Sequence, residues 1–211
     1  ERAGDTVELG ACRIVGELVV PAGVTLHGVP GTIVEAPADG TAITLVPAAS
    51  GTATTVSSLT VESHGTAGVV AHGAGLVALT TVVVEADAGV AVGLDGVEAN
   101  LSDVRIVGPV TRETRDDVRW LRVTSAPASP GHGPTATCDC EPGARDGDRT
   151  CDSSGRWATI TLTHGLFARG GALHAVRLSV TGLAAFGIVL EEVDADISAS
   201  SVSEGLGVGL E

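Results

Sequence analysis

A short spacing of apolar residues recurs along this chain and sets the strongest limit on its fold. An apolar residue is followed by two other residues, a second apolar residue, one further residue and a third apolar residue. Three successive copies begin at Val56, Leu79 and Leu101, with steps of 23 and 22 residues. The pattern returns at Val118, Leu121 and Val123, at Trp157, Ile160 and Leu162, at Leu173, Val176 and Leu178, and at Ile197 and Val202 around Ser200. A repeat of this length predicts a solenoid in which each copy forms one coil.

A second, shorter signature lies between the copies and begins with glycine. Alternating small and apolar residues follow each of these glycines, bounded by Gly and Asp turn residues, which is typical of short strands rather than helices. The copies lie at 68–70, 89–92, 187–190 and 207–210. We therefore expect an all-β fold of roughly seven or eight coils, whose strands pair in parallel with the coils above and below.

The composition agrees with thin stacked layers. Aromatic residues make up only 2% of the chain, whereas hydrophobic residues make up 44% and glycines number 29. A core with so few rings must be built from small aliphatic side chains, and the glycines supply tight corners.

The N-terminal stretch GDTVELGACRIVGELVVPAGVTLHGVPGTIVEAP, residues 4–37, carries a family resemblance. It resembles the opening of right-handed parallel β-helix proteins of the pectin-lyase-like superfamily. The resemblance implies a β-helix across most of the chain, outside about 124–156. Residues 124–156 break the repeat, so we expect a single domain over 1–211 interrupted there by a Cys-rich loop excursion. It implies no single activity, because that superfamily includes polysaccharide lyases, glycoside hydrolases, esterases, adhesins and tailspikes.

The interruption holds three of the four cysteines. It opens with the proline-rich run TSAPASPGHGPTAT and continues with Cys138, Cys140 and Cys151. An even cysteine count in a chain that we expect to be secreted favours disulfides that staple a loop without a core. Cys138 or Cys140 would pair with Cys151, and the remaining cysteine would join Cys12 or stay a free thiol.

Two metal sites are alternatives for the same loop. Zinc bound by its three cysteines with His132 or His164 would lack the paired C-x2-C spacing of strong zinc motifs. Calcium is the weak candidate at Asp146, Asp148 and Asp152, because alternating carboxylates can surround a hard cation. The position where an EF-hand loop needs a bidentate glutamate is a tryptophan, so we expect no cofactor, with calcium as the alternative.

Charge and length restrict the partners. The formal net charge is −14, so the body should repel nucleic acid. No apolar run is long enough for a membrane span. The chain contains no Met, from which we expect that a preceding segment was removed. All basic residues are Arg, which is typical of a GC-rich genome. We therefore expect a bacterial protein that is secreted or held in the cell envelope.

Our first functional hypothesis is a structural or interaction module at the cell surface. The solenoid would act as a rigid spacer, and the loop excursion would recognise a protein or polysaccharide. Trp120 and Trp157 flank the excursion and either form a surface patch or cover the core. The chain ends on GLGVGLE inside a repeat, so we expect that the natural protein continues or that another chain stacks there.

The alternative is a carbohydrate-active enzyme, most plausibly a polysaccharide lyase. Its working groups would be Arg119, Arg122, Asp116 and Asp117, which lie close together in the sequence. A match to polygalacturonases at Asp116-Asp117 and at the Gly-His-Gly of residues 131–133 lacks that family's Asn-Thr-Asp and Arg-Ile-Lys motifs.

The histidines offer no catalytic pattern. Four of them are scattered without a fixed Ser or Cys partner, so we expect hydrogen-bonded turn histidines. They are His64, His72, His164 and His174.

Overall fold

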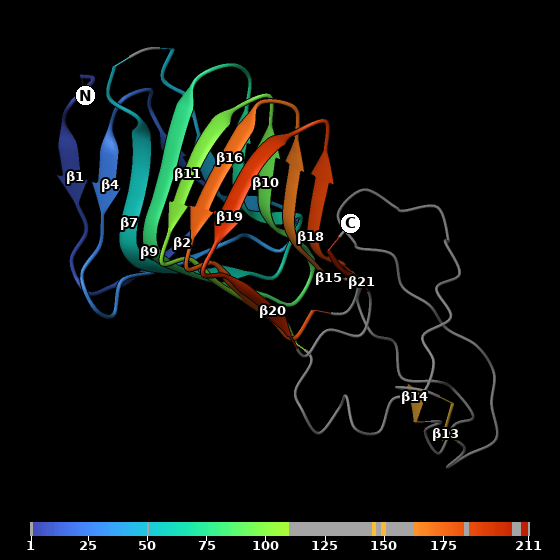
Figure 1. The fold of residues 1–211 in the computed structure, drawn as a ribbon. Helices are drawn as coiled ribbons and strands as arrows, with labels where there is room; N and C mark the ends of the chain where they lie inside the picture. Colours follow the sequence, from blue (N-terminus) through green and yellow to red (C-terminus); the bar gives the residue numbers. More distant parts are fainter. Residues whose placement is uncertain are drawn as a thin grey trace.

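The computed structural model is a stack of parallel β-strands (Figure 1). It describes residues 2–49, 51–109, 163–183 and 186–203, together with the backbone of three short strands: β13 (Arg145–Asp146), β14 (Arg149–Thr150) and β21 (Val208–Leu210). Within these ranges every regular element is a strand, which confirms the predicted all-β fold. The described part therefore contains no helix that could cross a membrane.

Each coil contributes strands to two sheets. The 12-stranded sheet turns a corner and so has two rows of strands, and a 7-stranded sheet closes each coil. The first row is β1 (Thr6–Glu8), β4 (Thr25–His27), β7 (Thr54–Ser63), β9 (Leu76–Ala86), β11 (Glu98–Ser102), β16 (Ala172–Val176) and β19 (Asp194–Ser198). The second row is β2 (Arg13–Val15), β5 (Ile33–Glu35), the second halves of β7 and β9, β12 (Arg105–Val107), β17 (Ser179–Thr181) and β20 (Ser201–Ser203). The 7-stranded sheet is β3 (Leu18–Val20), β6 (Thr41–Leu45), β8 (Ala67–His72), β10 (Gly89–Asp95), β15 (Thr163–Arg169), β18 (Phe186–Glu191) and β21.

The stack continues directly across the long insertion. β10 pairs with β15, β11 with β16 and β12 with β17, so the strands before residue 110 are hydrogen-bonded directly to those after residue 162. The apolar patterns predicted at 118–123 and 157–162 lie outside the described part. The described strands make about six turns, against the roughly seven or eight coils expected for the whole chain.

A left-handed corner explains the repeated spacing. In each copy the second of the two residues between the first apolar pair has a positive φ, which re-aims the chain and brings the next apolar residue inward. These corner residues stack in register: Ser58, Thr81, Asp103, Arg177 and Ala199, with φ between 50° and 58°. Each copy of the repeat therefore corresponds to two strands of one coil, joined at the left-handed corner.

The interior consists of continuous aliphatic rows. Val34, Val61, Val84, Ile106 and Val180 stack in register and are fully buried. Rows of this kind remove almost all of their apolar surface from water, and close packing between coils adds dispersion contacts. The buried core contains no aromatic side chain among the described residues.

The predicted register is wrong in one coil. Leu101 pairs with Ala175 rather than with Leu173, so the true copy there is Ala175, Leu178 and Val180. Val176, predicted to be inward, is 38% exposed. The chain follows the register that places Arg177 at the left-handed corner, and this lets the smaller Ala175 face the core.

Candidate functional site

A row of glutamates runs along the outer face of the second strand row. Glu35, Glu62 and Glu85 are direct neighbours in the parallel pairing of β5, β7 and β9. Each follows a fully buried valine, so the strand alternation points the carboxylates outward. Like charges in adjacent strands repel, so such a row requires compensating cations.

Arg13 compensates two of the three glutamates. Its guanidinium lies 2.5 Å from Oε2 of Glu35, and it donates to both carboxylate oxygens of Glu62 at 2.6 and 3.0 Å. These hydrogen bonds raise the pKa of Arg13 above its usual value. The pairs are partly solvated, so their contribution to stability is small. No ion pair involves Glu85 within the described ranges.

His64 and Asp87 lie beside this row, two residues further along the chain from Glu62 and Glu85 respectively. His64 Nδ1 lies 2.8 Å from Asp87 Oδ2, and His64 Nε2 lies 3.8 Å from Glu62 Oε2. The hydrogen bond to Asp87 is the main cause of a raised pKa of His64. This imidazole therefore bridges the coil of β7 and the coil of β9 and gains a proton more readily than an ordinary histidine.

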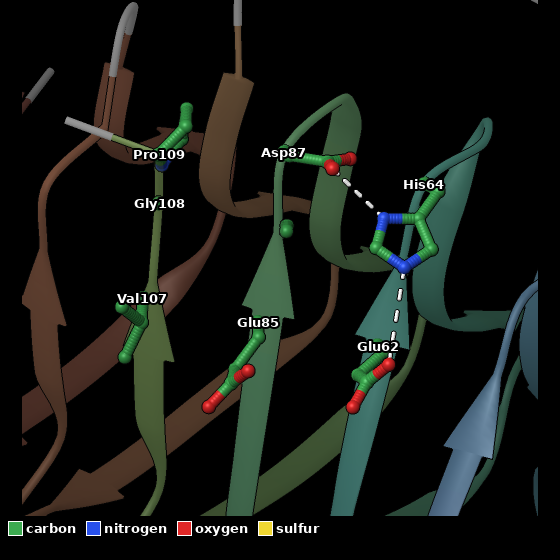
Figure 2. Close-up of a pocket in the computed structure, with 8 residues that line it drawn as sticks. Glu62, His64, Glu85, Asp87, Val107, Gly108 and Pro109 are labelled. Atoms are coloured by element: carbon green, nitrogen blue, oxygen red, sulfur yellow. Dashed lines mark hydrogen bonds and ion pairs between the residues drawn. The ribbon is translucent and has the colours of Figure 1, made fainter.

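These side chains line an open groove of about 430 Å³ (Figure 2). Glu62 and His64 form one side, and Glu85 and Asp87 lie on the central strand. Val107, Gly108 and Pro109 form the far side. Pro109 is the last described residue before the insertion. The groove therefore lies at the end of the described segment 51–109, and we call it the acidic groove.

The sequence contains a signal for this groove that the strand and motif patterns do not include. Val-Glu is followed by a small residue at 34–36, 61–63 and 84–86, in steps equal to one coil. The next residue is Pro37, His64 or Asp87, and Pro109 falls at the same position one coil later. Repeated spacing at the coil length predicts a shared face, so Glu62, His64, Glu85 and Asp87 could have been grouped.

The acidic groove carries unequal charge compensation. Both oxygens of Glu62 accept hydrogen bonds from Arg13, and Asp87 contacts His64. Glu85 has no such partner within the described ranges, so a bound cation would be attracted to this part of the groove. Over the described ranges, no group of three His, Cys, Asp or Glu side chains is arranged to hold a metal ion.

The predicted site residues fall almost entirely outside the described side chains. Cys12 is the exception: it is exposed and is a free thiol within the described part. The others are Asp116, Asp117, Arg119, Trp120, Arg122, Cys138, Cys140, Asp146, Asp148, Cys151, Asp152 and Trp157. The lyase, calcium, disulfide and tryptophan-patch hypotheses therefore stay predictions, as does stacking at the C-terminal end, since the side chains of 204–211 are also not described.

The histidines divide into different settings. His64 is hydrogen-bonded as predicted, and His72 Nδ1 lies 3.7 Å from Asp95 Oδ2. His164 instead stacks on the ring of Phe186.

No family model, no curated protein and no solved structure matches this chain.

Proposed function

We propose that this protein is an extracytoplasmic binding module of the pectin-lyase-like β-helix type. The acidic groove would bind a basic segment of a partner protein, next to the insertion that would complete the recognition surface. The observation that carries the proposal is the position of Glu85 and Asp87 on a groove that also contains Pro109, the last described residue before the segment with the predicted insertion. A rigid stack presents these charges in a fixed geometry, so little ordering entropy is lost on binding.

Charge supports a cationic partner. The chain has a net charge of −14, and within the described ranges Glu85 lacks a cation like the one that Arg13 provides for Glu35 and Glu62. An arginine side chain offers a planar fork that fits a carboxylate, and the groove holds Glu85 beside Asp87. The bound cation would therefore take the place of a second Arg13 in the glutamate row.

Binding of an arginine hexapeptide tests the groove. Glu85→Gln should weaken binding about two- to five-fold, the range for one partly exposed ion pair, and the loss should shrink as salt is raised. Glu98→Gln is the matched control, since Glu98 is exposed at the start of β11 and lies outside the groove. Isothermal titration of both variants separates a groove from a general effect of net charge.

Equal losses in the two variants would contradict the proposal, because they would show attraction to the whole acidic body. Binding of an amine-bearing oligosaccharide in place of the peptide, with the same dependence on Glu85, would replace the protein partner by a polysaccharide.

The proposed compartment has a separate test. Alkylation of the native protein without reduction, followed by intact mass, should modify at most two of the four cysteines, because the insertion would hold at least one disulfide. Modification of all four cysteines would contradict an extracytoplasmic, disulfide-stapled insertion, whatever the outcome of the peptide titration.

A further inference from the structure

A second pocket lies on the outer face of the 7-stranded sheet, away from the acidic groove. Its volume is about 330 Å³, and it is formed by side chains of β15 and β18. The lining residues are His164, Phe167, Phe186, Val189, Leu190 and Glu191. We call it the aromatic pocket.

The position of the two phenylalanines is unusual for this chain. The sequence contains only two Phe, and both line this one pocket while the described core is wholly aliphatic. Phe167 pairs with Val189 across β15 and β18, and the rings of His164 and Phe186 stack with centroids 5.3 Å apart and planes within 10°. All four side chains are only partly buried, so the solenoid interior does not require these rings.

Electrostatics at the pocket favour a cation over an anion. Phenyl and neutral imidazole faces carry negative quadrupole density, and burial lowers the pKa of His164, which keeps its ring neutral near neutral pH. The carboxylate of Glu191 lies at the rim. Arg169 is its register neighbour on β15, but no ion pair joins the two in the described structure.

We propose that the aromatic pocket binds a small organic cation with alkyl groups on its nitrogen, such as a trimethylammonium group. The phenyl rings would attract the charge, Val189 would cover the methyl groups, and the exposed Glu191 would complement the charge. The lining offers no hydrogen-bond donor fork for a carboxylate or phosphate, and the volume is at the lower end for small-ligand sites. This site is independent of the proposed groove function and lies on a different sheet.

The test uses choline and its neutral isostere, in which a tert-butyl group replaces trimethylammonium. Isothermal titration and ligand-observed NMR should detect choline binding to the whole protein and at least about threefold weaker binding of the isostere. Phe186→Leu keeps apolar bulk but removes a ring face, and should weaken choline binding about three- to thirty-fold.

Glu191→Gln and Glu192→Gln form a matched pair. Both residues are exposed and adjacent, but only Glu191 lines the pocket, so only the first substitution should weaken choline binding. Equal binding of the isostere, equal effects of the two Glu substitutions, or no detectable choline binding would each overturn the proposal. Glu85→Gln should leave choline binding unchanged, so this outcome is separate from that of the acidic groove.

Discussion

His64 and His164 show how differently the two outer faces of one solenoid can treat the same side chain. His64 lies in the acidic groove against Asp87 and Glu62, and its pKa is raised. His164 lies in the aromatic pocket against Phe186, and burial lowers its pKa. One face therefore stabilises a positive imidazole, while the other keeps the imidazole neutral.

The difference shows that the stack constrains the interior far more than the exterior. Each coil must supply aliphatic residues to the same buried rows, such as Val61, Val84 and Ile106. The outward positions between them carry glutamate, histidine or phenylalanine without disturbing these rows. In a fold of this kind, binding sites can therefore be changed by single outward substitutions.

The largest expected effect tests this division between interior and exterior. Leu79→Ala should lower the free energy of unfolding by about 2–5 kcal/mol, because it leaves a cavity in a fully buried row. Thr80→Ala, at the next and exposed position, should change it by less than about 0.5 kcal/mol. Urea unfolding measures both variants, and similar losses would show that the outer face is as constrained as the core.

Two glycines test the same comparison between interior and exterior, with a smaller expected effect on stability. Gly171 has φ +77°, and an added Cβ would lie 2.1 Å from the carbonyl oxygen of Val97, so Gly171→Ala should cost about 1–3 kcal/mol. Gly93 faces outward in register with Phe167, and its added Cβ would meet only Val70 and Val90 at 3.6 and 3.9 Å.

Gly93→Ala should therefore stabilise the protein by about 0.4–1 kcal/mol, by restricting the unfolded chain. Thermal unfolding of the two variants is expected to shift in opposite directions. A destabilised Gly93→Ala would mean that the face carrying the aromatic pocket has less freedom than its open surroundings indicate.

The parallel β-solenoid could be predicted from the sequence because the repeated residues are the ones that face the interior. Strand spacing and the apolar pattern follow from burial, which acts at every coil. The register of one coil was missed because Leu173, Val176 and Leu178 fit the pattern with bulkier residues than Ala175, Leu178 and Val180. Only the left-handed corner at Arg177, a backbone property, decides between them.

The sites were harder to predict because they depend on outward residues from several coils. Glu62 and Glu85 lie 23 residues apart, and only the length of one coil indicates that they are neighbours in space. The link from Arg13 to Glu62 depends on which side chains face outward across two coils, and no short motif encodes it.

Ser63 allows a test of the interior next to the acidic groove, because it lies between Glu62 and His64 in the chain but is fully buried. Its hydroxyl is fully buried without a hydrogen-bond partner in the described structure, and its register neighbour is Ala86. Ser63→Ala should raise the free energy of unfolding by about 1 kcal/mol, because it removes an unsatisfied polar group. Chemical unfolding measures the change. A loss of stability would reveal a hydrogen bond made by this hydroxyl, and the interior row would then contribute to holding Glu62 and His64.

The smallest effects on stability come from the histidines themselves, and they have opposite signs. His64 has a folded pKa above its unfolded value of 6.5, so its stabilising contribution is complete below pH 6.5 and is lost as the pH rises through the folded pKa. His164 has a lowered folded pKa, so its contribution is complete above pH 6.5 and is lost as the pH falls toward that lower value. The His64 contribution should stay below about 1 kcal/mol because the pair is partly exposed.

NMR titration of the ring protons measures the pKa of each histidine directly, even where the change in stability is too small to measure. The variants His64→Gln and His164→Gln assign the resonances. His64 should titrate above 6.5 and His164 below it. Asp87→Asn should lower the pKa of His64 and leave His164 unchanged, because only His64 hydrogen-bonds to Asp87. Phe186→Leu should raise the pKa of His164 alone, since a smaller side chain admits water to the imidazole. If the two histidines titrated together in the unaltered protein, the two faces would not differ electrostatically, and the acidic groove and the aromatic pocket would lose their separate preferences for ligands.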